Sequence, residues 1–160
     1  MPTFQLQAMH PSVRPVALIA VLLLLAACGS APRTSAGVAG RVTLEVSGGF
    51  TGWDRIVTVE SDGTARVQVI QGPSPSAGSK QIEPLVLARL HSLVSDPAFA
   101  ELDSAYLPPP GGADLQDYLV TAEVGGRTLK TMTRDGADPP AILRDVLRIL
   151  NEILAQISAP

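Results

Sequence analysis

Alternating apolar and polar residues recur along much of the chain and predict half-buried β-strands. Five segments carry this pattern: residues 41–47, 53–60, 65–70, 115–124 and 127–133. In the first of them, Val42, Leu44 and Val46 share one face, and polar side chains fill the other. The dipeptides Asp-Gly at 62–63 and Gly-Gly at 125–126 each favour a tight hairpin. The strands are therefore expected to pair largely antiparallel.

A helical period replaces the alternation in two segments, 84–95 and 140–156, and each segment begins with a proline, which suits the first helical position. The last segment has a broad apolar stripe that includes Ile142, Val146, Ile149 and Ile153. A helix with so wide a stripe is expected to lie deep on the sheet. Between the two segments, Asp96 is expected to cap a short helical turn that brings Phe99 onto the core.

The order of these elements is β-β-β-α-β-β-α. It predicts an α+β fold in which two helices pack on one face of a largely antiparallel five-stranded sheet. Residues 71–79 and 107–112 are rich in Pro and Gly and are expected to be loops. The other sheet face is expected to be solvated, with no evident substrate pocket. Its predicted residues are Thr43, Glu45, Thr58, Glu60, Arg66, Gln68, Thr121 and Glu123.

The N-terminal part of the chain has a different pattern. Residues 16–27 form an uncharged apolar run that is too short to span a bilayer, since a spanning helix needs about 20 residues. With Arg14 before it, the run is typical of the central region of a secretory signal peptide. Either Met1 or Met9 suits the start of such a signal.

The sequence Leu-Ala-Ala-Cys at 25–28 directly follows this run and resembles the bacterial lipobox. The resemblance implies that Cys28 is acylated, for example with palmitate, and becomes the first mature residue; an ordinary signal with an incidental cysteine is the alternative. The expected organisation is a signal peptide at 1–27, a lipidated flexible tether at 28–40 and a single α+β domain at 41–157. The protein is then exported and anchored to the outer face of the cytoplasmic membrane or, in a two-membrane envelope, to either membrane.

Composition excludes several classes of function. The chain has 160 residues, of which 17% are charged, and a net charge of −3. It therefore lacks the basic density that binds nucleic acid. A single cysteine excludes a disulfide framework, and two histidines argue against a His-built zinc site. We expect no metal, no cofactor and no small-molecule substrate.

Isolated polar residues carry weaker signals. Asp114 and Asp117 are three residues apart and could hold a cation, although such residues more often end a strand. His91 lies beside the apolar stripe of its helix and is expected to be a surface or boundary residue, not a general base. An enzyme with an unrecognised hydrolytic site is one candidate class, but no nucleophile and base are evidently paired. We therefore expect a protein that is not an enzyme.

The most informative local feature is the segment 47–53, Ser-Gly-Gly-Phe-Thr-Gly-Trp, which lies between the first two predicted strands. One interpretation is a hairpin connection whose Phe50 folds back into the core. The other is a displayed loop, in which the glycines permit close backbone approach and Phe50 and Trp53 anchor a partner. The segment is not a phosphate loop, because it leads into a strand and lacks the Lys-Ser/Thr pair.

This segment is similar to the Gly-Gly-Phe-Ala/Ser-Gly signature of emfourin-type proteins. Three further features agree in order: the leucine-rich segment 84–90, the Asp-x-x-x-Tyr motif at 114–118, and a Gly-Gly hairpin followed by a strand and an amphipathic helix. The resemblance covers about residues 41–156. Two features depart from the family pattern, namely Thr51 in place of the frequent Ala, and the lipobox.

Emfourin-type proteins are inhibitors of protealysin-like, thermolysin-family metallopeptidases. The resemblance implies that this chain is a lipid-anchored module that inhibits such a peptidase by occluding its cleft. The implied partner-binding residues are Gly48, Gly49, Phe50, Thr51, Gly52 and Trp53, together with Asp114 and Tyr118. The alternative is an envelope lipoprotein of the same fold that binds another protein and inhibits nothing.

Overall fold

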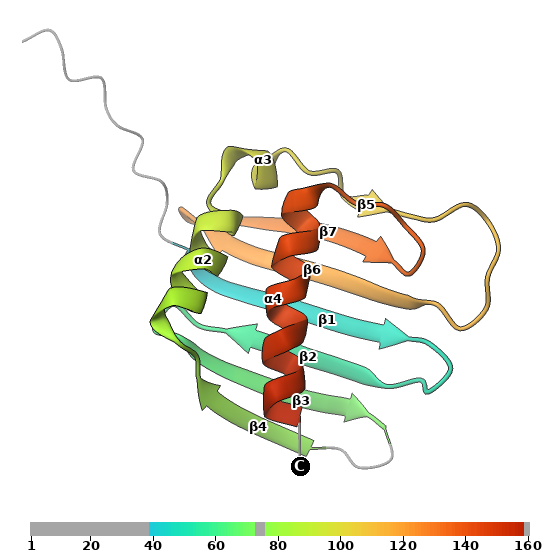
Figure 1. Cartoon of the computed structure of the whole chain (residues 1–160), viewed down its shortest axis with the longest axis horizontal. Helices are drawn as coiled ribbons and strands as arrows, with labels where there is room; N and C mark the ends of the chain where they lie inside the picture. Colours follow the sequence, from blue (N-terminus) through green and yellow to red (C-terminus); the bar gives the residue numbers. More distant parts are fainter. Residues whose placement is uncertain (1–38, 73–75, 159–160) are drawn as a thin grey trace, which may run out of the picture. The chain divides into compact units, whose positions relative to one another are not determined.

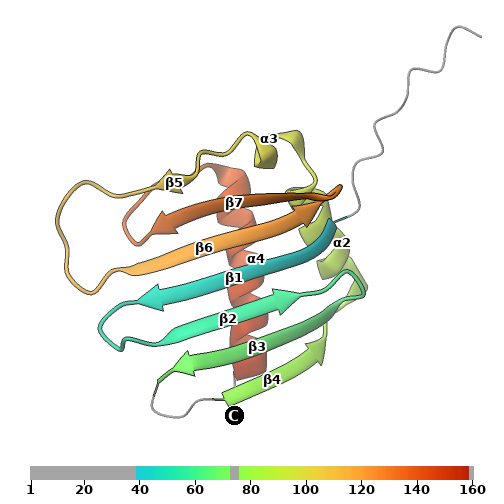
Figure 2. The same cartoon turned by 180° about the vertical axis from the view of Figure 1, so that it is seen from behind.

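The computed structural model describes residues 39–72 and 76–158. Within them the chain forms one seven-stranded sheet in the order β4-β3-β2-β1-β6-β7-β5, and helices cover one face of it (Figures 1 and 2). The strands are β1 (Ala39–Gly48), β2 (Asp54–Val59), β3 (Thr64–Gln71), β4 (Ser76–Gln81), β5 (Ala105–Tyr106), β6 (Gln116–Val124) and β7 (Arg127–Arg134). The helices are α2 (Pro84–Val94), α3 (Pro97–Ala100) and α4 (Ala141–Ser158).

The α+β class, the mostly antiparallel pairing and the single helix-covered face are confirmed. The central strand β1 pairs antiparallel with β2 and β6, and only the short β5 pairs parallel, with β7. The hairpin at 62–63 is also confirmed, because Asp62 Oδ1 accepts a 2.8 Å hydrogen bond from the backbone N–H of Thr64. The side chain of Asp96 caps α3 as expected, by accepting from the N–H of Ala98.

The expected number of strands is wrong, since the sheet has seven strands, not five, whereas α3 is the short helical turn expected after Asp96. Most of β4 falls in the segment 71–79 that was expected to be a loop. This strand has no hydrophobic alternation because it pairs at the sheet edge through its backbone. The two residues of β5 are too few to show a period.

The first strand begins at Ala39, two residues inside the expected tether, and Ala39 is buried. The remainder of that tether, the predicted signal peptide and Cys28 lie outside the described residues. None of the helices in 39–72 and 76–158 is both long enough and apolar enough to cross a membrane.

The core lies between the sheet and the helices. Val42, Leu44 and Val46 of β1 are fully buried, as the alternation predicts, and α4 covers them with a stripe that includes Ile149 and Ile153. Leu90 and Val94 of α2 and Phe99 of α3 close one side. At the edge, a side chain on Gly78 of β4 would lie only 2.8 Å from Ile157, so glycine lets the end of α4 approach the sheet.

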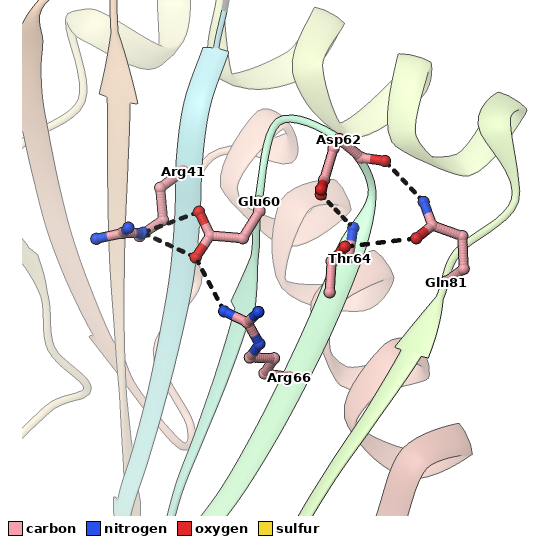
Figure 3. Close-up of polar contacts among 6 residues, drawn as sticks. All are labelled: Arg41, Glu60, Asp62, Thr64, Arg66 and Gln81. Atoms are coloured by element: carbon pink, nitrogen blue, oxygen red, sulfur yellow. Dashed lines mark hydrogen bonds and ion pairs between the residues drawn. The ribbon is translucent and has the colours of Figure 1, made fainter.

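The opposite sheet face carries no helix (Figure 2). At one end of it, Glu60 lies between Arg41 and Arg66, at 3.2 Å and 3.8 Å respectively (Figure 3). A shallow hollow of about 290 Å³ lies over this group, although no pocket is evident from the sequence. Its walls are Arg41, Thr43, Ile56, Thr58, Glu60, Arg66 and Gln68, five of which belong to the predicted solvated face. Glu60 offsets only one of the two arginines, so the hollow keeps a net positive charge.

Candidate functional site

Three connections meet at one end of the sheet, which we call the loop end: loop 48–53 between β1 and β2, loop 107–115 between β5 and β6, and loop 135–140 between β7 and α4 (Figure 1). The register brings them together, since Gly48 of β1 pairs with Gln116 of β6 and Asp117 pairs with Arg134 of β7. Every candidate partner-binding residue from the sequence lies at this end.

Glycines shape loop 48–53. Gly48, Gly49 and Gly52 all have positive φ, a region that favours glycine, and the N–H of Gly52 closes a turn onto the carbonyl of Gly49 at 3.1 Å. A side chain on Gly48 would also lie 3.0 Å from the carbonyl oxygen of Leu115. The three glycines are therefore needed both for the turn and for close contact with loop 107–115.

The structure places Phe50 outside the core, with 87% of its surface exposed. This result favours the displayed loop over the hairpin that folds back. Trp53 is less exposed, at 36%, and lies against Gly72 at the end of β3. Thr51 is exposed beside Phe50. Loop 48–53 thus displays one aromatic side chain to solvent and keeps the second partly covered.

Asp114 lies beside loop 48–53, because the next residue, Leu115, accepts a 3.1 Å hydrogen bond from the backbone N–H of Gly49. Its own φ of 62° makes Asp114 the one non-glycine residue with positive φ in the described part of the chain. Its carboxylate is exposed and has no hydrogen-bond or ion-pair partner among the described residues. Of the two candidates outside loop 48–53, Asp114 is thus free to contact a partner.

Tyr118 occupies a different position. It lies on the helix-covered face, packs against the core, and donates a 3.0 Å hydrogen bond from its hydroxyl to Gln116 Oε1. Burial raises the pKa of Tyr118 above its ordinary value, and the carboxylate of Asp135 raises it further. A shallow hollow of about 230 Å³ lies beside Tyr118 and loop 135–140. Tyr118 therefore supports the loop end from beneath.

Gln116 is a residue of this site that the sequence does not single out. A side chain on Gly49 would lie 2.9 Å from Gln116 Cγ, so the glutamine packs directly beneath the loop. Its N–H donates to Asp135 Oδ2, and its carbonyl accepts from the N–H of Asp135, both at 3.0 Å. Gln116 thus contacts loop 48–53 and loop 135–140 and is continuous with loop 107–115. A single glutamine at the start of a strand carries no sequence signal of that role.

The cation site considered for Asp114 and Asp117 is not favoured, because Arg134 already holds the carboxylate of Asp117 through two hydrogen bonds of 2.7 Å and 3.0 Å. These bonds lower the pKa of Asp117 below its ordinary value. Within the described ranges, no group of three or more His, Cys, Asp or Glu side chains is arranged to hold a metal ion.

His91 belongs to α2, which lies away from the loop end (Figure 1). Burial lowers the pKa of His91 below its ordinary value.

No protein-family model matches this chain, and no curated protein sequence matches it. The resemblance to emfourin-type proteins therefore rests on the short motifs of the sequence alone.

Proposed function

We propose that the protein is a lipid-anchored inhibitor of a thermolysin-type metallopeptidase and that loop 48–53 occludes the cleft of the enzyme. The observation that carries the proposal is the exposure of Phe50 at 87% on a loop held at both ends by β1 and β2. Single exposed apolar side chains are common on protein surfaces. What favours a binding role for Phe50 is its place on a glycine-rich loop whose backbone is fixed by hydrogen bonds. Thermolysin-type enzymes favour bulky apolar residues in their specificity pocket, which Phe50 matches in size and polarity.

Preorganisation supports the same role. Immobilising a flexible loop on binding costs affinity, whereas a loop that is already fixed avoids that cost. Loop 48–53 is fixed by its internal Gly52–Gly49 hydrogen bond and by the bond from Gly49 to Leu115. An aromatic residue that enters a pocket from such a loop is a typical binding hot spot.

The proposed mechanism is steric. Residues 48–53 contain no Cys, His, Asp or Glu, so the loop has no side chain that ligates zinc. Phe50 would fill a side-chain pocket while the glycines bring the backbone close to the cleft. The lipid on Cys28 would hold the inhibitor at the membrane, because the acyl chains of a lipoprotein bury many CH₂ groups, each worth about 0.8 kcal/mol.

The test is inhibition of a panel of thermolysin-type metallopeptidases, thermolysin included, by the full chain purified in detergent. We expect Phe50→Ala to weaken inhibition about 30-fold or more, which corresponds to a hot spot of about 2 kcal/mol. Leu85→Ala is the matched control, since Leu85 is an apolar residue of α2 that is 83% exposed. It should inhibit like the unmodified protein.

Two results would contradict the proposal. If the unmodified protein inhibits no enzyme of the panel, the alternative gains support, namely an envelope lipoprotein that binds another protein. If Phe50→Ala inhibits as well as the unmodified protein, loop 48–53 is not the contact.

A further inference from the structure

Loop 48–53 is too small to form a stable interface alone. Specific protein–protein interfaces bury about 800 Å² on each partner and involve about 20 to 30 residues a side. Six residues with one exposed aromatic supply only a fraction of that area. If loop 48–53 binds a peptidase, then neighbouring segments of the loop end must bind it too.

Loop 107–115 is the neighbour in direct contact. The backbone N–H of Gly49 donates to the carbonyl of Leu115 at 3.1 Å, and Gly48 packs against the same carbonyl oxygen. Residues 108–110 are three prolines, which restrict the backbone of this loop before any partner binds. The end of loop 107–115 is therefore joined to loop 48–53 at Leu115, while Gly111 and Gly112 separate that contact from the three prolines.

Gln116 fixes the two loops relative to each other. Its Cγ lies beneath Gly49, its amide oxygen accepts from Tyr118, and its backbone is bonded in both directions to Asp135. Movement of Gln116 would shift loop 48–53 and the end of loop 107–115 together. Its effect on binding would therefore pass through the position of these two loops.

Asp114 supplies a carboxylate next to the contact between the two loops. Its carboxylate is exposed and unpaired within the described residues, and it precedes the residue that bonds to Gly49. Its positive φ is a conformation that L-residues adopt at a cost, although Asp tolerates it better than most residues. The fold thus places Asp114 and Phe50 each one residue away from the hydrogen bond that joins Leu115 to Gly49.

We propose, building on the proposed function, that the binding surface is composite. Loop 48–53 and the end of loop 107–115 bind the same peptidase as one rigid unit, Asp114 pairs with a basic side chain at the rim of the pocket that receives Phe50, and Gln116 is a positioning residue. The partner is therefore a peptidase whose apolar specificity pocket is bordered by Lys or Arg.

The charge contact is tested by association kinetics. Asp114→Lys should slow association with the inhibited peptidase about tenfold at low ionic strength, and the difference should shrink at high salt, because rim charges act mainly on the association rate. Glu123→Lys is the control, since Glu123 is exposed near the other end of β6. Equal association rates for Asp114→Lys and the unmodified protein at low salt would overturn the role of Asp114.

The positioning role is tested by a rescue and a double mutant. Gln116→Ala should weaken inhibition about tenfold, whereas Gln116→Met should retain most of it, because methionine keeps the packing beneath Gly49 without the amide. In the Phe50→Ala background, Gln116→Ala should cost clearly less than it does in the unmodified protein, since part of its effect passes through the Phe50 contact. Thermal melting shows whether each variant folds, and the Met variant keeps the test valid if the Ala variant does not.

The outcomes separate the two proposals. If Phe50→Ala has no effect, the proposed function fails. If Phe50→Ala weakens inhibition but Asp114→Lys and Gln116→Ala behave like the unmodified protein, the peptidase contact stands and the composite surface fails. Additive losses for Phe50→Ala and Gln116→Ala would show that Gln116 does not act through loop 48–53.

Discussion

Asp117 and Arg134 lie directly opposite each other on β6 and β7 and form a two-point ion pair, with Arg134 Nε 2.7 Å from Asp117 Oδ1 and Nη2 3.0 Å from Oδ2. The pair lies on the open face of the sheet, next to the residues from which loops 107–115 and 135–140 extend. A planar guanidinium that meets a carboxylate at two points restricts the relative motion of two strands more than a single contact does. The pair therefore ties together the strand ends that carry the candidate site.

The first prediction concerns the acid sensitivity of this pair. Hydrogen bonding to Arg134 lowers the pKa of Asp117 below its ordinary value of 3.8. Its stabilising effect is therefore complete above about pH 5 and is lost as the pH falls through the lower pKa of the folded state. Asp117→Asn should lower stability slightly at pH 7 and flatten its decline below pH 4. Urea unfolding between pH 2.5 and 7 measures this, and parallel profiles for the two proteins would contradict it.

The second prediction concerns His91. Its Nε2 is buried and has no hydrogen-bond partner within residues 39–72 and 76–158, and burial lowers its pKa below the ordinary value of 6.5. The folded state therefore favours the neutral ring, so stability should be complete above about pH 7 and fall as the pH drops through 6.5 towards the folded-state pKa. Chemical unfolding of His91→Phe should show no such decline between pH 7 and 5. The idea fails if the unmodified protein is equally stable across this range.

The third prediction concerns the contact between α4 and the sheet. Ile149 and Ile153 are both 3% exposed. Ile149→Ala or Ile153→Ala should each reduce the free energy of unfolding by about 2–5 kcal/mol, since each leaves a cavity in a packed core. Leu85→Ala, an exposed leucine-to-alanine change on α2, should change it little. An unchanged melting temperature for either isoleucine variant would mean that α4 is not essential to the core.

The fourth prediction concerns Cys28. If Cys28 carries the lipid, the Cys28→Ser protein should be lost from the membrane fraction or should keep its signal peptide. Labelling with radioactive palmitate, followed by fractionation, compares the variant with the unmodified protein. Palmitate label on Cys28→Ser would show that the acyl chain is attached elsewhere and would contradict the lipobox interpretation.

The spacing of apolar residues along the chain predicts most of this fold, because most of its strands and helices have one buried face. The burial of Val42, Leu44 and Val46 follows directly from their alternation, and the stripe on α4 predicts the helix that covers them. The edge strand β4 cannot be predicted from hydrophobic alternation. Its sequence, Ser-Ala-Gly-Ser-Lys-Gln, buries little, and backbone pairing with β3 alone makes it a strand.

Only part of the candidate site can be predicted from the sequence. Glycine spacing identifies loop 48–53, but a glycine turn can either display Phe50 or fold it inward, and tertiary packing decides between them. Tyr118 shares its strand face with the buried Val120, so its position beneath the loops follows from alternation. The role of Gln116 depends on β1 lying next to β6, a long-range pairing that no local pattern encodes.

Trp53, the only tryptophan of the chain, lies at the end of loop 48–53 with Gly72 close to its indole ring. Its fluorescence therefore comes from one known place in the molecule, beside the proposed contact and outside the main core. A shift in emission wavelength or in acrylamide quenching would report on that loop alone, while circular dichroism reports on the rest of the fold. Peptidase binding can thus be followed on the unlabelled protein, provided that the catalytic partner is chosen or engineered to be free of tryptophan.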